Sequence, residues 1–108
     1  MKDLSTVETF LEVHAIPEKH FWSGKWKIEG KISNHSLLQS YKNPELLVKC
    51  YNRKKELISQ KTVHLKNTLA PDTDTRFQFT LERIPGSKTL EIVLTDAEPL
   101  PLFAQYHE

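Results

Sequence analysis

The chain has 108 residues, with 38% hydrophobic residues, one cysteine, and 15 basic against 14 acidic side chains. This size and composition fit one small domain with a single core, so we expect one domain over residues 1–108. A formal charge of +1 gives no long-range attraction to phosphate, which disfavours a dedicated nucleic-acid binder. We expect no signal peptide in this segment, because residues 1–8 contain no apolar h-region, and no membrane insertion, because no stretch approaches the roughly 18 apolar residues of a span.

The first segment of the chain fits two secondary structures. Ser5 and Glu8 have the spacing of a helix capping box. Alternation and β-branched residues between Val7 and Ala15 favour a strand, which is our preferred interpretation. From Lys25 to Ile32, apolar and charged residues alternate cleanly, which predicts a half-buried strand with Trp26 on its core face.

Four further runs of alternating residues predict strands at 45–52, 57–66, 76–83 and 89–95. In the run 57–66, Ser59 and Lys61 interrupt the apolar face, so we expect a partly exposed or edge strand there. The pair Pro85-Gly86 suits the middle of a turn and predicts a hairpin between the last two runs. A short edge strand at Leu100–Tyr106 is possible, since its prolines allow only an edge position.

These elements point to an all-β protein, an antiparallel immunoglobulin-like β-sandwich of about six to seven strands. A barrel is the main alternative. We expect loops at 17–24, 34–44 and 67–74, which are polar links between the runs. Gly30 lies inside a predicted strand, where a bulge or close backbone packing is expected.

The order of several short motifs resembles a known bacterial family. Gly30 to Asn34 reads Gly-Lys-Ile-Ser-Asn, a run Val48 to Asn52 reads Val-Lys-Cys-Tyr-Asn, and Pro71 precedes the strand containing Phe77. This pattern, over about residues 30–80, resembles the FxLYD-type immunoglobulin-like domains of bacteria. Val48, Cys50, Tyr51 and Asn52 would occupy the positions of Phe, Leu, Tyr and Asp in the naming motif. The resemblance implies a noncatalytic accessory domain of the cell envelope or extracytoplasmic space.

Residues that could carry chemistry are scattered. The five histidines show none of the spacings typical of zinc sites, so we predict no metal ligands. Asp72 and Asp74 are expected to stabilise a turn rather than bind calcium. Cys50 falls on the core face of its strand, where a thiol is inert, and no nucleophile elbow or glycine-rich phosphate loop is present. We therefore predict no catalytic residues and no cofactor, and we do not expect an enzyme.

Exposed aromatic and basic residues are the remaining candidates for binding. Phe21 and Trp22 stand in a predicted loop and either cap the end of the sandwich or contact a partner or a sugar ring. The run Arg53–Lys55 could form a basic face together with Lys25, Lys27, Lys31 and Lys49. Glu29, Glu45 and Glu56 are interleaved with these residues, so a solvated strand face is favoured over a nucleic-acid site. We expect a noncatalytic interaction or spacer domain with a protein partner; the alternative is a carbohydrate or small-ligand module that uses Phe21 and Trp22.

Overall fold

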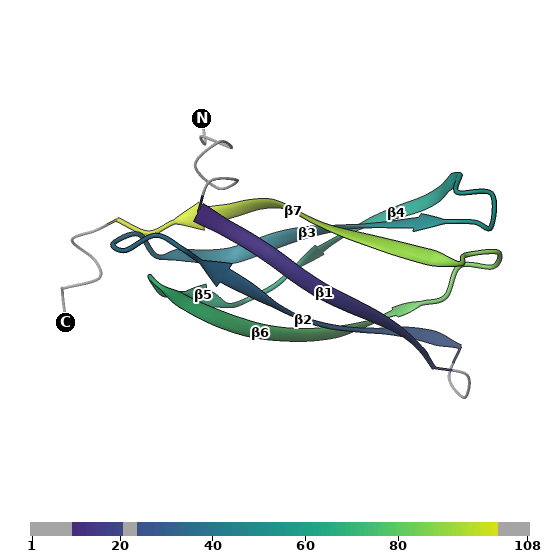
Figure 1. The fold of residues 1–108 in the computed structure, drawn as a ribbon, viewed down its shortest axis with the longest axis horizontal. Helices are drawn as coiled ribbons and strands as arrows, with labels where there is room; N and C mark the ends of the chain where they lie inside the picture. The colour runs from purple at the N-terminus through teal and green to yellow at the C-terminus, as the bar shows by residue number, and fades with distance from the viewer. Residues whose placement is uncertain (1–9, 21–23, 102–108) are drawn as a thin grey trace.

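The computed structural model describes the backbone of residues 10–20 and 24–101, and their side chains apart from those of 17–20. These residues form seven antiparallel strands in two sheets (Figure 1). The strands are β1 (Leu11–His20), β2 (Lys25–Asn34), β3 (Tyr41–Tyr51), β4 (Leu57–His64), β5 (Thr68–Leu69), β6 (Thr73–Glu82) and β7 (Thr89–Pro99). The predicted all-β sandwich is confirmed, and the alternative of a barrel is not, because the strands divide into two separate sheets.

One sheet has the strand order β1-β2-β6, and in the other β3 is central, with β4 and the short β5 on one side and β7 on the other. In immunoglobulin domains one sheet contains strands A, B and E, and the other contains G, F and C. By connectivity, β1-β2-β6 corresponds to A-B-E, and β3 with β7 corresponds to C with F. Among the described residues, no strand takes the position of G beside β7.

The strands extend further than the sequence pattern indicated. The expectation of a loop at 17–24 is wrong for residues 17–20, because these residues continue the pairing of β1 with β2. A proline is tolerated there because β1 is an edge strand. Similarly, Tyr41 pairs with both Leu69 and Pro99, so β3 begins inside the segment expected to be a loop. Leu100 and Pro101 lie outside any strand; residues 102–106 of the proposed last strand, and the possible capping box at Ser5 and Glu8, lie outside the described residues.

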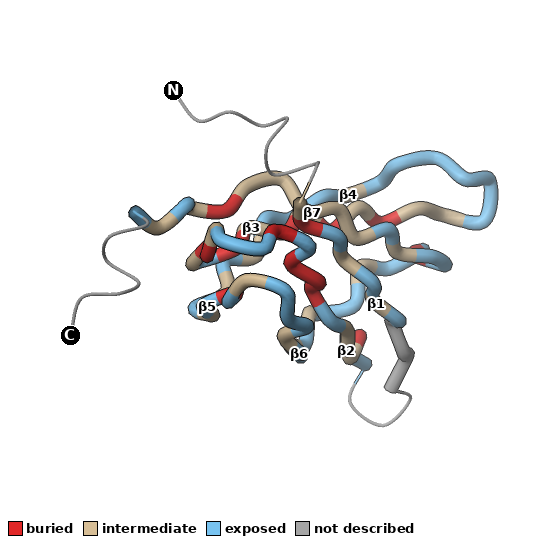
Figure 2. The backbone as a smooth tube through the Cα atoms, turned by 60° about the vertical axis from the view of Figure 1, so that its left-hand side comes forward, coloured by how far each residue is buried: buried red, intermediate tan, exposed pale blue. Residues whose placement is uncertain are grey.

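The alternating residues of β2 and β3 form the core between the sheets (Figure 2). Trp26 is 4% exposed, and its indole Nε1 donates a hydrogen bond to Ser87 Oγ at 3.4 Å, which fixes the turn before β7 to the core. The other buried apolar side chains are those of Leu11, Ile28, Ile32, Tyr41, Leu46, Val48, Cys50, Leu69, Phe77 and Ala97. Burial of this alternating set is what drives the two sheets together.

Gly30 is a point of close packing rather than a bulge. The register runs without a shift through Ala15, Gly30 and Phe77 on the three strands of one sheet. A Cβ at position 30 would lie 2.8 Å from Phe77 Cζ and 2.9 Å from the Cα of Ala15, and closer still to the carbonyl oxygen of His14. Only glycine fits here, because both a strand backbone and an aromatic ring occupy the space.

The predicted edge position of β4 is confirmed. Its residues are mostly exposed, and it pairs with β3 alone. Lys61 stands opposite the buried Val48 in the register, on the side of the sheet that faces the core. A charge at such a position protects an edge strand from pairing with other chains.

The hydroxyl group of Tyr41 is buried in the core, which leads to a prediction about stability. Its side chain is 1% exposed, and its hydroxyl makes no hydrogen bond within the described part of the chain. Burial also raises the pKa of the Tyr41 hydroxyl above its ordinary value. Because a buried hydroxyl without a partner costs free energy, we expect Tyr41→Phe to leave the free energy of unfolding unchanged or to raise it by about 1 kcal/mol. Urea unfolding measures this, and a decrease of similar size would contradict it.

Candidate functional site

The loop between β2 and β3 presents two adjacent leucines to solvent. Leu37 is 78% exposed and Leu38 is 61% exposed, which makes Leu37 the most exposed large apolar side chain in the described residues. We call residues 35–40 the leucine loop. Two adjacent exposed apolar side chains offer a partner a larger apolar surface to cover than scattered single ones do.

The base of the leucine loop is held by a buried asparagine. Asn34 is 2% exposed, and its Nδ2 donates to the carbonyl oxygens of Gln39 at 2.8 Å and of Leu69 at 3.0 Å. Its Oδ1 accepts the backbone N–H of Ser36 at 3.0 Å. One side chain therefore closes the loop on itself and fastens it to β5.

Further hydrogen bonds fix the loop to the rest of this end of the sandwich. Ser36 Oγ accepts the N–H of Gln39 at 2.9 Å, and the carbonyl of Ser36 accepts the N–H of Asp72 at 2.9 Å. Gln39 Nε2 donates to the carbonyl oxygen of Leu100 at 2.6 Å. Because the loop backbone is anchored to three other segments, a partner could bind the leucines without paying to order the backbone.

Glu12 of β1 contacts two histidines, of which His35 is the first residue of the leucine loop. Glu12 Oε1 lies 3.0 Å from His14 Nε2, and Glu12 Oε2 lies 3.0 Å from His35 Nε2. The backbone N–H of His35 also donates to the carbonyl of Phe10 at 2.8 Å, so β1 is fastened to the start of the loop. Each imidazole contacts a different oxygen of the Glu12 carboxylate. Within the described ranges, no group of three or more His, Cys, Asp or Glu residues is arranged to hold a metal ion.

The Glu12 contacts predict a pH-dependent effect. The hydrogen bond with His35, followed by the charge of His14, holds the pKa of the Glu12 carboxyl below its ordinary value. A lowered pKa in the folded state stabilises the fold at pH above the unfolded pKa, and this stabilisation is lost as the pH falls through the folded pKa. We expect His35→Gln to raise the pKa of Glu12 toward the ordinary value, as measured by an NMR titration of the carboxyl carbon. The matched variant His64→Gln, near Glu45, should leave the pKa of Glu12 unchanged; equal titrations of Glu12 in the wild type and in His35→Gln would contradict the expectation.

The structure places the other candidates apart from the leucine loop. Phe21 and Trp22, between the end of β1 and Gly24, lie outside the described residues. Cys50 is 7% exposed, and burial raises the pKa of its thiol, as expected for an inert cysteine. The expected turn before β6 is present, and Asp72 adopts a φ of 54° in it. The side-chain bond at this turn comes from Thr73, whose Oγ1 donates to the carbonyl of Ala70 at 2.7 Å. The expectation is wrong for Asp74, because Asp74 lies within β6, where its Oδ2 accepts from Lys31 Nζ at 3.5 Å.

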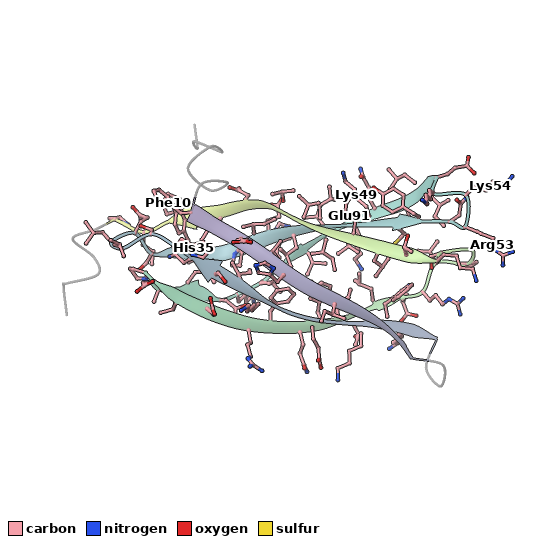
Figure 3. All side chains as sticks on the ribbon, in the orientation of Figure 1. Phe10, His35, Lys49, Arg53, Lys54 and Glu91 are labelled. Carbon is pink, nitrogen blue, oxygen red and sulfur yellow. The ribbon has the colours of Figure 1, made fainter. Side chains whose placement is uncertain are left out.

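The basic residues do not gather on one face. Figure 3 places Arg53 and Lys54 at the tip of the β3–β4 hairpin, while Lys49 lies beside Glu91 farther along the sheet. On the other sheet, Lys25 lies 3.7 Å from Glu82 and Lys27 lies 2.8 Å from Glu29. This interleaving of charges is typical of a solvated strand surface rather than a phosphate-binding one.

A concave space opens between the edges of the two sheets. It has a volume of about 960 Å³, and its apolar lining includes Val13 and Ala15 of β1, Phe77 of β6, and Leu90 and Ile92 of β7. Except for Phe77, these side chains belong to the half-buried margin of the core. We call this space the edge groove.

Sequence reasoning missed the leucine loop. Its only local signal is the pair Leu37-Leu38 within a segment expected to be polar. The hydrogen bonds that make the loop a fixed platform reach Leu69 and Leu100, which lie 35 and 61 residues from their partners along the chain. Spacing along the sequence carries no information about contacts of this kind.

Comparison with known proteins finds no match for this chain among family models, curated proteins or solved structures. No helix in the described residues is long and apolar enough to cross a membrane. A function for the chain must therefore be argued from its own residues.

Proposed function

We propose that the protein is a noncatalytic interaction domain that binds a protein partner through the leucine loop. The observation that carries this proposal is the exposure of Leu37 and Leu38 on a loop whose base is buried and hydrogen-bonded at Asn34. Apolar side chains on a loop whose backbone is held by hydrogen bonds can fill pockets on a partner with little loss of backbone conformational entropy.

The proposal includes the resemblance to FxLYD-type domains and the envelope or extracytoplasmic setting that it implies. What supports this part is the order of motifs along the chain and the place of the naming motif at the end of β3. Val48 and Cys50 are buried there, while Tyr51 is half-buried and donates from its hydroxyl to Glu91 Oε1 at 2.9 Å. The motif positions thus act in packing and hydrogen bonding, which suits a structural rather than a catalytic signature.

Affinity capture from the host, with Leu37→Ser/Leu38→Ser beside the wild type, tests the proposal. We expect the partner recovered by the wild type to fall at least about tenfold with this variant, because two central apolar anchors are removed. Both side chains are exposed, so the unfolding midpoint should not change by much.

The matched control is Leu57→Ser/Ile58→Ser, which removes two exposed apolar side chains from β4 instead. This control should retain the partner. Equal recovery of the same partner by the leucine-loop variant would show that the loop is not the binding surface.

A further inference from the structure

We propose that Leu102 and Phe103, from the segment that follows β7, cover Leu37 and Leu38 of the leucine loop in the free protein, and that a partner displaces them. Residues 102–108 lie outside the described part of the chain, and Leu102-Phe103 is the first pair of that segment. The displacement rests on the function proposed above, whereas the contact within the chain does not.

Leu100 is fixed at the base of the leucine loop. Its backbone N–H donates to the carbonyl oxygen of Ser40 at 2.9 Å, and its carbonyl oxygen accepts from Gln39 Nε2 at 2.6 Å. In Figure 1, the end of β7 lies at the same end of the sandwich as the loop between β2 and β3. The segment that follows Pro101 therefore starts beside this loop.

The pairing of β3 with β7 sets the direction in which the chain leaves. Tyr41 stands opposite Pro99 in the antiparallel register, and the bond from Leu100 to Ser40 continues this register by one residue. In an antiparallel pair, a forward step on one segment runs alongside a backward step on the other. The chain after Leu100 is thus directed along the limb of the leucine loop that leads back from Ser40 to its leucines.

Equal counts along the two segments bring apolar residues together. Leu102 lies two residues beyond the pair formed by positions 100 and 40, and Leu38 lies two residues before it; Phe103 and Leu37 are each three residues away. Two residues of chain span at most about 7 Å, so these side chains are within reach of one another. The backbone bends at 37–38, so we expect contacts between side chains rather than a continued ladder.

The free-energy terms favour this contact. Leu37 and Leu38 are largely exposed, and covering them with two apolar side chains removes apolar surface from water. The loop backbone is already held by Asn34, so only the short segment after Pro101 must be ordered. A tether of so few residues also gives the two surfaces a high effective concentration.

The N-terminal segment is the other candidate occupant, because it leaves beside the same loop. The N–H of His35 donates to the carbonyl of Phe10 at 2.8 Å, which continues the register of β1 and β2 by one residue. The same count then sets Glu8 opposite Leu37. A carboxylate loses hydration against an apolar side chain, whereas the pair 102–103 is wholly apolar. The composition of the two segments therefore favours the C-terminal one.

NMR of the intact chain tests the contact without a partner. We expect nuclear Overhauser cross-peaks between the methyl groups of Leu37 and Leu38 and the ring of Phe103. Phe103→Leu keeps an apolar side chain but removes the ring, so the ring-current shift of these methyl resonances should be lost. The methyl resonances of the exposed Leu57, at the far end of β3, should not move. Cross-peaks to Val7 in place of Phe103, or to neither residue, would overturn the proposal.

Partner capture tests the displacement. We expect Leu102→Ser/Phe103→Ser to raise recovery of the partner about fivefold, because the apparent affinity of a covered site is reduced by the fraction that is open. Gln105→Ser, in the same segment, should leave recovery unchanged. Unchanged or lower recovery with the double variant would overturn the displacement. Equal recovery by Leu37→Ser/Leu38→Ser would instead overturn the proposed function, and the NMR contact would be unaffected by that result.

Discussion

Replacing Asn34 with alanine is expected to lower the free energy of unfolding by about 3 kcal/mol. The substitution removes three hydrogen bonds and leaves the carbonyl oxygens of Gln39 and Leu69 and the N–H of Ser36 without the amide that satisfies them. Each such bond contributes about 0.5–1.5 kcal/mol net, and more where a buried group is left unsatisfied. Urea unfolding of the two proteins measures the difference.

The variant Asn34→Asp tests the two donor bonds of the Asn34 side chain separately from its acceptor bond. The carboxylate keeps an oxygen for the N–H of Ser36 but loses both N–H donors and brings a buried charge against two carbonyl oxygens. Such a carboxyl has a raised pKa in the folded state, so its destabilisation is complete above the folded pKa and is relieved as the pH falls to the unfolded pKa. A destabilisation of this variant that does not depend on pH would contradict the role assigned to Asn34.

Asn52 provides the matched control at the opposite end of the sandwich. Its exposed Oδ1 accepts the N–H groups of Lys54 and Glu56, each at 2.9 Å, and its Nδ2 makes one longer bond of 3.2 Å to Glu56 Oε1. We expect Asn52→Asp to cost less than about 1 kcal/mol, because the acceptor is kept and the site is solvated. Asn34→Ala should also reduce partner capture through the leucine loop, whereas Asn52→Asp should not.

The contrast between β2 and the leucine loop shows how far the sequence predicts this molecule. The alternation from Trp26 to Ile32 predicts a core face because successive side chains of a strand point to opposite sides, and Ile28 and Ile32 are 0% and 1% exposed. That rule is local and needs no knowledge of the partner strands. The expectation of an all-β fold was based on the same local rule.

Contacts between segments that are distant along the chain could not be predicted from local alternation. The end of β1 and the start of β3 were assigned to loops as polar links between the runs, whereas β1 pairs with β2 as far as His20 and β3 begins at Tyr41, which pairs with both Leu69 and Pro99. The meeting of His14 and His35 at Glu12 depends on the β1–β2 register, which a pattern of spacings does not contain. The candidate site was missed for the same reason, since the anchors of Leu37 and Leu38 are long-range.

Gly30→Ala is expected to destabilise the fold by about 3 kcal/mol, a cost near the upper end for overpacked cores. The added methyl group would meet the backbone of β1 at His14 and Ala15 as well as the ring of Phe77. Neither side can give way easily, because Ala15 and Phe77 are held at the same register position on the strands that flank β2. Chemical denaturation at constant pH measures the loss.

Two further variants separate the causes of this loss. Gly86→Ala has no atom within 4 Å of the new Cβ and adopts a φ of 88°, so it should cost only about 1–2 kcal/mol of backbone strain. Phe77→Leu combined with Gly30→Ala removes the ring contact but not the contact with β1, so the double variant should show a favourable coupling of about 1 kcal/mol and remain less stable than Phe77→Leu alone. If Phe77→Leu abolished the cost of Gly30→Ala entirely, the close approach of β1 to β2 would not be what requires glycine at position 30.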